Sequence, residues 1–130
     1  METLLAQLGV VREEPTGALC TPIYLSAVYR HSGLGESTGF DYIRTGNPTR
    51  QVLEQAIAAL EGGAQGFAFS SGMAAIQTVL SLFAQGDHLL VSLDLYGGTY
   101  RLLEQVMSRF GLEASYVDTR SLQELEKALR

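Results

Sequence analysis

The chain has 130 residues, of which 46% are hydrophobic and 18% charged, a composition typical of one soluble globular domain. Its net charge of -5, with nine basic residues scattered along the sequence, argues against nucleic acid and anionic membrane surfaces as partners. Cys20 is the single cysteine, which excludes an intrachain disulfide, and no stretch approaches the about 18 uninterrupted apolar residues of a membrane span. We therefore expect a cytoplasmic protein.

The first part of the chain is predicted to be mostly extended. Residues 3–9 have room for one or two helical turns, after which Pro15 and Pro22 interrupt any regular pattern. An extended arm is expected up to about residue 29, followed by a polar, glycine-rich loop over residues 31–39. Such an arm has little of its own to pack against.

The motif Y-I-R-T-G-N-P-T at residues 42–49 places a phenol and a guanidinium two residues apart in front of a turn. Tyr42 and Arg44 form a pair able to clamp a phosphate. The N-P dipeptide favours a turn, Gly46 allows an unusual backbone angle, and Thr49 is placed to cap the helix that follows. A partly buried tyrosine beside a solvated arginine is the plainer interpretation of the same residues.

After this motif the apolar pattern alternates between helical and strand periods, and the glycines at 62–63, 86 and 111 mark turns or helix ends. The alternation predicts a parallel sheet with right-handed crossovers, and therefore an α/β fold. The predicted elements are a helix over residues 50–60, a strand over 67–69, a helix over 72–83, a strand over 88–93, a helix over 99–110, a strand over 112–117, and a last helix capped by Ser121 and Glu124 with Leu122, Leu125 and Leu129 in the core.

Two further motifs follow predicted strands, where open parallel sheets bind their ligands. The S-S-G-M run at residues 70–73 begins a helix whose first N–H groups lack partners, and Gly72 lets an anion approach them. In D-L-Y-G-G-T-Y at residues 94–100, the glycines leave room for Tyr96 to lie on a ligand ring. A plain strand-to-helix turn and a tyrosine packed on the surface are the alternatives.

Taken in order, the three motifs resemble the transsulfuration enzymes of Cys/Met metabolism. This pyridoxal-phosphate (PLP) family includes cystathionine γ-synthase, the cystathionine lyases, methionine γ-lyase and O-acetylhomoserine sulfhydrylase. The resemblance runs along nearly the whole chain, and residues 29–50 are most similar to the γ-synthase and the sulfhydrylase. It implies the N-terminal portion of the large domain of a fold-type I PLP-dependent transferase. Residues 1–49 would form the arm and an intersubunit clamp, and residues 50–130 an incomplete PLP-binding α/β domain.

The resemblance also implies a role for each motif in binding PLP. Gly72 and Met73 would present backbone N–H groups to the cofactor phosphate, while Tyr96 would stack on the pyridine ring and assist proton transfer. Tyr42 and Arg44 would reach the phosphate of a neighbouring subunit. Each complete site would then need two chains, as in a dimer or tetramer of identical subunits.

The activity implied by the resemblance is γ-replacement on an O-acyl-homoserine, with cysteine or sulfide as the incoming thiol. Arg101 would help to bind this amino-acid substrate. Thr45 stands where some synthases carry a second arginine, which favours an acetyl over a succinyl group. A γ-lyase that cleaves cystathionine or methionine is the alternative within the same family.

The chain does not contain the catalytic lysine of the family. Lys127 is the only lysine, and it lies opposite the apolar stripe of the last predicted helix, in no motif like that of the Schiff-base lysine. We therefore expect the chain alone to be inactive, and a non-catalytic fragment that binds phosphate or a partner subunit is the alternative of another class. His31 and His88 are interpreted as structural or solvated, and no metal-ligand spacing occurs. In the family's sheet, later strands separate the first strand from the next two, so residues 66–130 would leave apolar edges uncovered.

Overall fold

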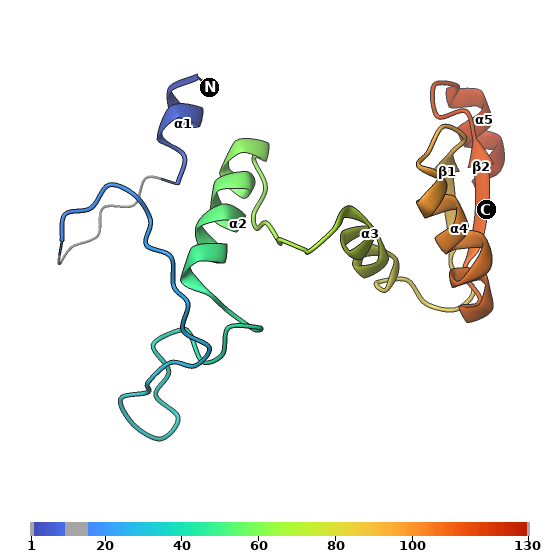
Figure 1. The fold of residues 1–130 in the computed structure, drawn as a ribbon. Coiled ribbons are helices and arrows are strands. Elements are labelled where there is room, and N and C mark those ends of the chain that lie inside the picture. The colour runs from blue at the N-terminus through green and yellow to red at the C-terminus, as the bar shows by residue number, and fades with distance from the viewer. Residues whose placement is uncertain (1, 10–15, 130) are drawn as a thin grey trace. The chain divides into compact units, whose positions relative to one another are not determined.

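A computed structural model describes residues 2–9 and 16–129 of the chain (Figure 1). The chain divides into two compact units, Met1–Ala68 and Phe69–Arg130, and each is described by itself. Pro15, which the sequence predicts to interrupt the arm, lies outside the described residues. Within the described ranges, no helix is both long enough and apolar enough to cross a membrane.

The first unit contains helices α1 (Glu2–Gln7) and α2 (Pro48–Glu61), joined by the arm. Helix α1 confirms the helical turns expected over residues 3–9. Helix α2 confirms the helix expected over 50–60, because its apolar residues recur at helical spacing and Gly62 ends it with a φ of 65°. The described residues between the two helices form turns, bends and irregular backbone, with isolated antiparallel bridges in place of regular strands.

Asn47 connects the arm to the beginning of α2. Its side-chain Oδ1 accepts a hydrogen bond from the Arg50 N–H at 3.1 Å, which makes it the N-cap of the helix. Its Nδ2 donates to the Tyr24 carbonyl at 3.1 Å and to the Tyr29 hydroxyl at 3.4 Å. Only 7% of the residue is exposed. A buried amide therefore satisfies polar groups of both segments at once.

Two details of this turn differ from the prediction. Thr49 does not cap α2, because Asn47 takes that position, and its hydroxyl instead accepts the Tyr24 N–H at 2.9 Å. Gly46 has no positive φ. The Phe40 ring lies 3.4 Å from the place where a Cβ of Gly46 would stand, so the glycine provides space rather than an unusual backbone angle.

The second unit is built on two parallel strands, shown side by side in Figure 1. Their register pairs His88 with Glu113 at one end and Ser92 with Val117 at the other, which confirms the predicted parallel arrangement. The helix expected over 99–110 is divided into an α-helix and a 3-10 helix. The elements in order are α3 (Gly72–Leu80), β1 (His88–Ser92), α4 (Gly97–Gln105), η1 (Met107–Phe110), β2 (Glu113–Val117) and α5 (Leu122–Ala128).

The core of this unit is small. Four buried side chains form it, with partly buried apolar residues of α3, α4 and both strands packed against them. Gly86 and Gly111 adopt φ values of 91° and 80°, as their predicted turn positions require. The buried residues of this cluster are Leu80, Leu103, Met107 and Leu112.

Three predictions about residues 66–130 are wrong. Residues 67–69 form no strand, and Phe67 is 68% exposed, because no described segment pairs with them. Helix α3 ends at Leu80 rather than at residue 83. Leu122 and Leu129 are 75% and 67% exposed, so α5 has no apolar stripe in the core. These exposed side chains agree with the expectation that residues 66–130 leave apolar surface uncovered.

We expect Asn47→Ala to destabilise the junction between arm and α2 by about 2 kcal/mol, since it removes an N-cap bond and leaves the partly buried Tyr24 carbonyl without its amide donor. Asn47→Ser is the matched control, because its hydroxyl retains the cap and loses the amide donors. The expected destabilisation by Asn47→Ser is about half of that by Asn47→Ala. Amide hydrogen exchange over residues 51–60 measures the opening free energy of α2, and equal protection in Asn47→Ala and the unmodified chain would contradict the assignment.

Candidate functional site

Tyr42 and Arg44 contact each other directly. The Arg44 Nη2 donates to the Tyr42 hydroxyl at 2.8 Å, and the guanidinium carbon lies 5.2 Å from the centre of the tyrosine ring. Both side chains are exposed. Because the tyrosine accepts this bond, its hydroxyl proton stays available for an anion, as do the remaining N–H groups of the guanidinium. The pair fits a phosphate group, which needs several donors at one place.

The backbone beneath this pair forms a tight turn. The Tyr42 carbonyl accepts the N–H groups of Thr45 and Gly46, both at 3.0 Å, and the Thr45 hydroxyl at 2.9 Å. On the arm side, the Ile43 N–H donates to the Ala27 carbonyl at 2.9 Å. This turn lies at residues 42–46 and contains the two side chains, which it holds on an ordered backbone, whereas the turn predicted at Asn47 and Pro48 is replaced by the beginning of α2.

Asp41, next to this turn, organises the preceding glycine-rich loop. Its Oδ1 accepts a hydrogen bond from the Ser37 hydroxyl and contacts the His31 Nε2 at 2.8 Å. These two partners, Ser37 above all, lower the pKa of the Asp41 carboxyl. His31 thus has a structural contact within the loop. His88, on β1, also has one, because its Nε2 lies 2.7 Å from the Ser115 hydroxyl.

The first turn of α3 presents free backbone donors. Ser71 is its N-cap and accepts the Ala74 N–H at 3.1 Å, while its carbonyl accepts the Ala75 N–H. The N–H groups of Gly72 and Met73 have no intrahelical acceptors. A Cβ at Gly72 would meet nothing within 4 Å, so an anion can approach this backbone.

Tyr96, Gly98 and Met73 lie close together in the second unit. Tyr96 stands just before α4 and is 69% exposed. A Cβ at Gly98 would lie 2.5 Å from the Tyr96 Cε1 and 3.1 Å from the Met73 Sδ. Gly98 therefore leaves space for the ring beside the first turn of α3, as the glycine pair predicts. The structure brings together two of the residues expected to bind PLP.

Arg101 follows on α4 and is exposed. Its Nη1 would lie 3.9 Å from a Cβ at Gly97, which places the guanidinium over the first turn of its own helix. The described side chains offer it no acidic partner. The Arg101 guanidinium is therefore available for a carboxylate ligand. Its assignment to the substrate carboxylate stays a prediction.

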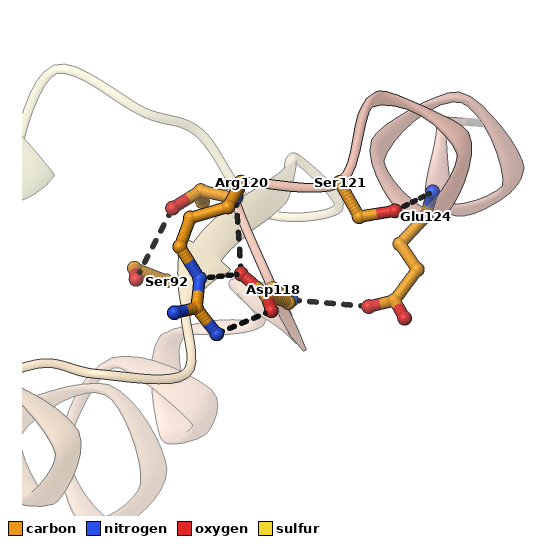
Figure 2. A network of polar contacts seen from close by, with 6 residues as sticks. Ser92, Asp118, Arg120, Ser121 and Glu124 are labelled. Carbon is orange, nitrogen blue, oxygen red and sulfur yellow. Dashed lines mark hydrogen bonds and ion pairs between the residues drawn. The ribbon is translucent and has the colours of Figure 1, made fainter.

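Sequence reasoning did not find the polar network at the carboxyl ends of β1 and β2 (Figure 2). Arg120 donates to Asp118 through Nε at 2.9 Å and through Nη2 at 2.8 Å, which lowers the pKa of that carboxyl. The Thr119 hydroxyl lies 3.4 Å from that of Ser92, and the two loops line a cavity of about 320 Å³. The signal available in the sequence was the position of D-T-R directly after a predicted strand.

The same figure shows the beginning of α5. Ser121 accepts the Glu124 N–H at 3.3 Å, which confirms half of the predicted capping box. The Glu124 carboxylate does not return to Ser121 and instead accepts the Asp118 N–H at 3.2 Å. The glutamate thereby connects α5 to the end of β2.

A family model described as Cys/Met metabolism PLP-dependent enzyme matches residues 2–130. The chain belongs to this family. It is 63% identical over 118 residues to a cystathionine γ-synthase/O-acetylhomoserine (thiol)-lyase of Bacillus subtilis, covering 91% of this chain and 32% of the relative. It is 48% identical to a cystathionine γ-lyase of the same organism, covering 99% of this chain and 34% of the relative.

Solved structures show the same family fold. The crystal structure of cystathionine γ-lyase from Lactobacillus plantarum, complexed with L-serine, matches 99% of this chain with a TM-score of 0.93 and 47% identity, over 34% of its own length. The chain thus spans about a third of the length of the relatives it matches. The comparisons confirm the predicted fold class, part of the large domain of a fold-type I PLP-dependent enzyme, and PLP as the cofactor of this Cys/Met family.

The domain boundary and the site residues stay predictions. The two compact units of this Cys/Met family member divide between Ala68 and Phe69. The boundary predicted between residues 49 and 50 concerns the domains of the longer enzyme. The roles assigned to Tyr42, Arg44 and the residues of the second unit rest on the geometry given above and on the resemblance.

Gly98→Ala and Gly97→Ala are a matched pair in the first turn of α4. We expect Gly98→Ala to displace the Tyr96 ring and the Met73 side chain, whereas Gly97→Ala has room and should stabilise the helix by up to about 1 kcal/mol. Methyl NMR of the methionines resolves the difference: the Met73 signal should shift in Gly98→Ala and not in Gly97→Ala. Identical Met73 signals in both variants would show that the three residues do not pack as described.

Proposed function

We propose that this chain is the N-terminal part of a PLP-dependent enzyme that performs γ-replacement on an O-acyl-homoserine, with cysteine or sulfide as the thiol. The identity of 63% to a γ-synthase/thiol-lyase, against 48% to a γ-lyase of the same organism, supports this choice. Thr45, in the position where some synthases carry a second arginine, supports the acetylated substrate.

The paired side chains of Tyr42 and Arg44 carry the proposal that the chain binds the cofactor. Both side chains are exposed and belong to one ordered turn, so their remaining donors are accessible to a phosphate. In our proposal they act on the cofactor of a neighbouring subunit, so the enzyme is a homo-oligomer. When bound, PLP supplies the electron sink for carbanion chemistry on the substrate.

Residues of the second unit would complete the site. The N–H groups of Gly72 and Met73 would donate to the cofactor phosphate at the positive end of the α3 dipole. Tyr96 would cover the cofactor ring and move a proton near the substrate amine, and Arg101 would bind the substrate carboxylate. We place the enzyme in the cytoplasm, and we propose that the chain alone is inactive, because Lys127 lies in no catalytic motif.

Crossed chimaeras test the reaction. Residues 2–130 replace the matching third of the Bacillus subtilis γ-synthase/thiol-lyase and, separately, of the γ-lyase. We expect the first chimaera to form cystathionine from O-acetylhomoserine and cysteine within about tenfold of its parent, since about 1.4 kcal/mol allows for imperfect packing at the junction. In the second, the ratio of replacement to elimination should rise above that of the parent γ-lyase.

The outcomes separate the alternatives. Loss of replacement in the first chimaera, with elimination in the second kept at the parental level, would favour the γ-lyase. A folded pair of chimaeras that both fail to bind PLP would favour the non-catalytic fragment.

The clamp is tested by Arg44→Ala in the first chimaera. We expect PLP affinity to fall about tenfold or more, because a charged hydrogen bond to phosphate contributes about 1.5–3 kcal/mol. Binding of pyridoxal, which lacks the phosphate, should change less than twofold. Titration of both compounds against the apoprotein measures this, and an unchanged PLP affinity would refute the role of Arg44.

A further inference from the structure

We propose that Arg50 is the positioning residue of the phosphate clamp, fixing the backbone from which Tyr42 and Arg44 project. The inference rests on the proposed role of that pair. Arg50 lies in the first turn of α2, outside the clamp motif, and nothing in the sequence marks it. Its side chain reaches back along the chain to the turn at residues 42–46.

Arg50 contacts the backbone carbonyls of this turn. The N–H groups of the turn converge on one carbonyl, that of Tyr42, which leaves the following carbonyls to find other donors. The Arg50 Nη1 donates to the Ile43 carbonyl at 3.3 Å, and its Nη2 donates to the carbonyls of Arg44 and Thr45 at 3.5 and 3.3 Å. One guanidinium thus spans three consecutive carbonyls, as arginine does at the end of a helix.

Arg50 is itself held in place. Its Nε lies 3.4 Å from the Glu54 Oε1, one turn further along α2. The same carboxylate oxygen accepts the Ala68 N–H at 3.0 Å. Both charged side chains are partly buried, so the carboxylate balances the positive charge beneath a turn that already carries Arg44. The Arg50 guanidinium therefore contacts Glu54 on one side and the three carbonyls of the turn on the other.

The consequence concerns the entropy of binding. Arg44 is exposed, and its guanidinium meets the Tyr42 hydroxyl across the turn at residues 42–46. Without Arg50, part of the ordering of this turn would have to accompany phosphate binding, which lowers affinity. A planar fork of five donors suits this task, whereas the single ammonium of a lysine cannot span three carbonyls.

The experiment uses the γ-synthase chimaera and measures its affinity for PLP and for pyridoxal. Arg50→Ala should weaken PLP binding about tenfold and pyridoxal binding less than twofold, and Arg50→Lys should restore only part of the loss. Gln55→Ala, an exposed polar position on the same helix, is the matched control and should change neither affinity. In the Arg44→Ala background, Arg50→Ala should cause a clearly smaller further loss of PLP affinity than it causes alone, because only the Tyr42 contact is left for Arg50 to position.

Each contrary result has a distinct meaning. If Arg44→Ala alone leaves PLP affinity unchanged, the clamp itself is refuted. If Arg44→Ala weakens PLP binding but Arg50→Ala does not, only the positioning role fails. Equal losses for PLP and pyridoxal, or losses that multiply in the double variant, would show that Arg50 supports the fold generally and would overturn the inference. Should Arg50→Ala not fold, Arg50→Gln and Arg50→Lys provide the same comparison.

Discussion

The first unit depends on the buried amide of Asn47. A primary amide has donors and an acceptor in one plane, and here the acceptor begins α2 while the donors bind the arm at Tyr24 and Tyr29. The arm itself contributes little apolar burial, so hydrogen bonds to this residue and to Thr49 determine where it lies. Aspartate would retain the cap but would place a carboxylate against the Tyr24 carbonyl, which is why an amide and not an acid suits this position.

The turn that carries Tyr42 and Arg44 lies next to this junction. This turn is supported by the arm at the Ile43 N–H and by α2 through Arg50, on either side of the junction that Asn47 makes between arm and helix. An exposed pair such as Tyr42 and Arg44 contributes little to stability by itself. In the proposed role, the pair presents several donors in a fixed arrangement, and preorganised groups lose less entropy when an anion binds.

The features that the sequence predicted depend on residues close together in the chain. Periodicity and turn chemistry predicted helix α2, the helix ends and turns at glycines, and the parallel pairing of the strands. The glycine pair after Tyr96 predicted the space that Gly98 leaves for the tyrosine ring. The failures have physical reasons. Phe67 and Leu122 have apolar patterns, but no described segment covers them. Thr49 and Asn47 are both good capping types, and only proline at the first helical position distinguishes them. The role of Arg50 was invisible, because its partners are backbone carbonyls.

The division of donors between two chains has a thermodynamic consequence for the proposed enzyme. If one subunit supplies the clamp and another supplies the N–H groups of Gly72 and Met73, cofactor binding and subunit association become linked equilibria. A cofactor that binds the assembled pair more tightly than the separate chains must stabilise the pair by the same factor. The exposed apolar residues Phe67 and Phe69 lie a few positions before these donors in the sequence. The exposed apolar side chains and the proposed phosphate-binding N–H groups therefore belong to one continuous segment of the chain.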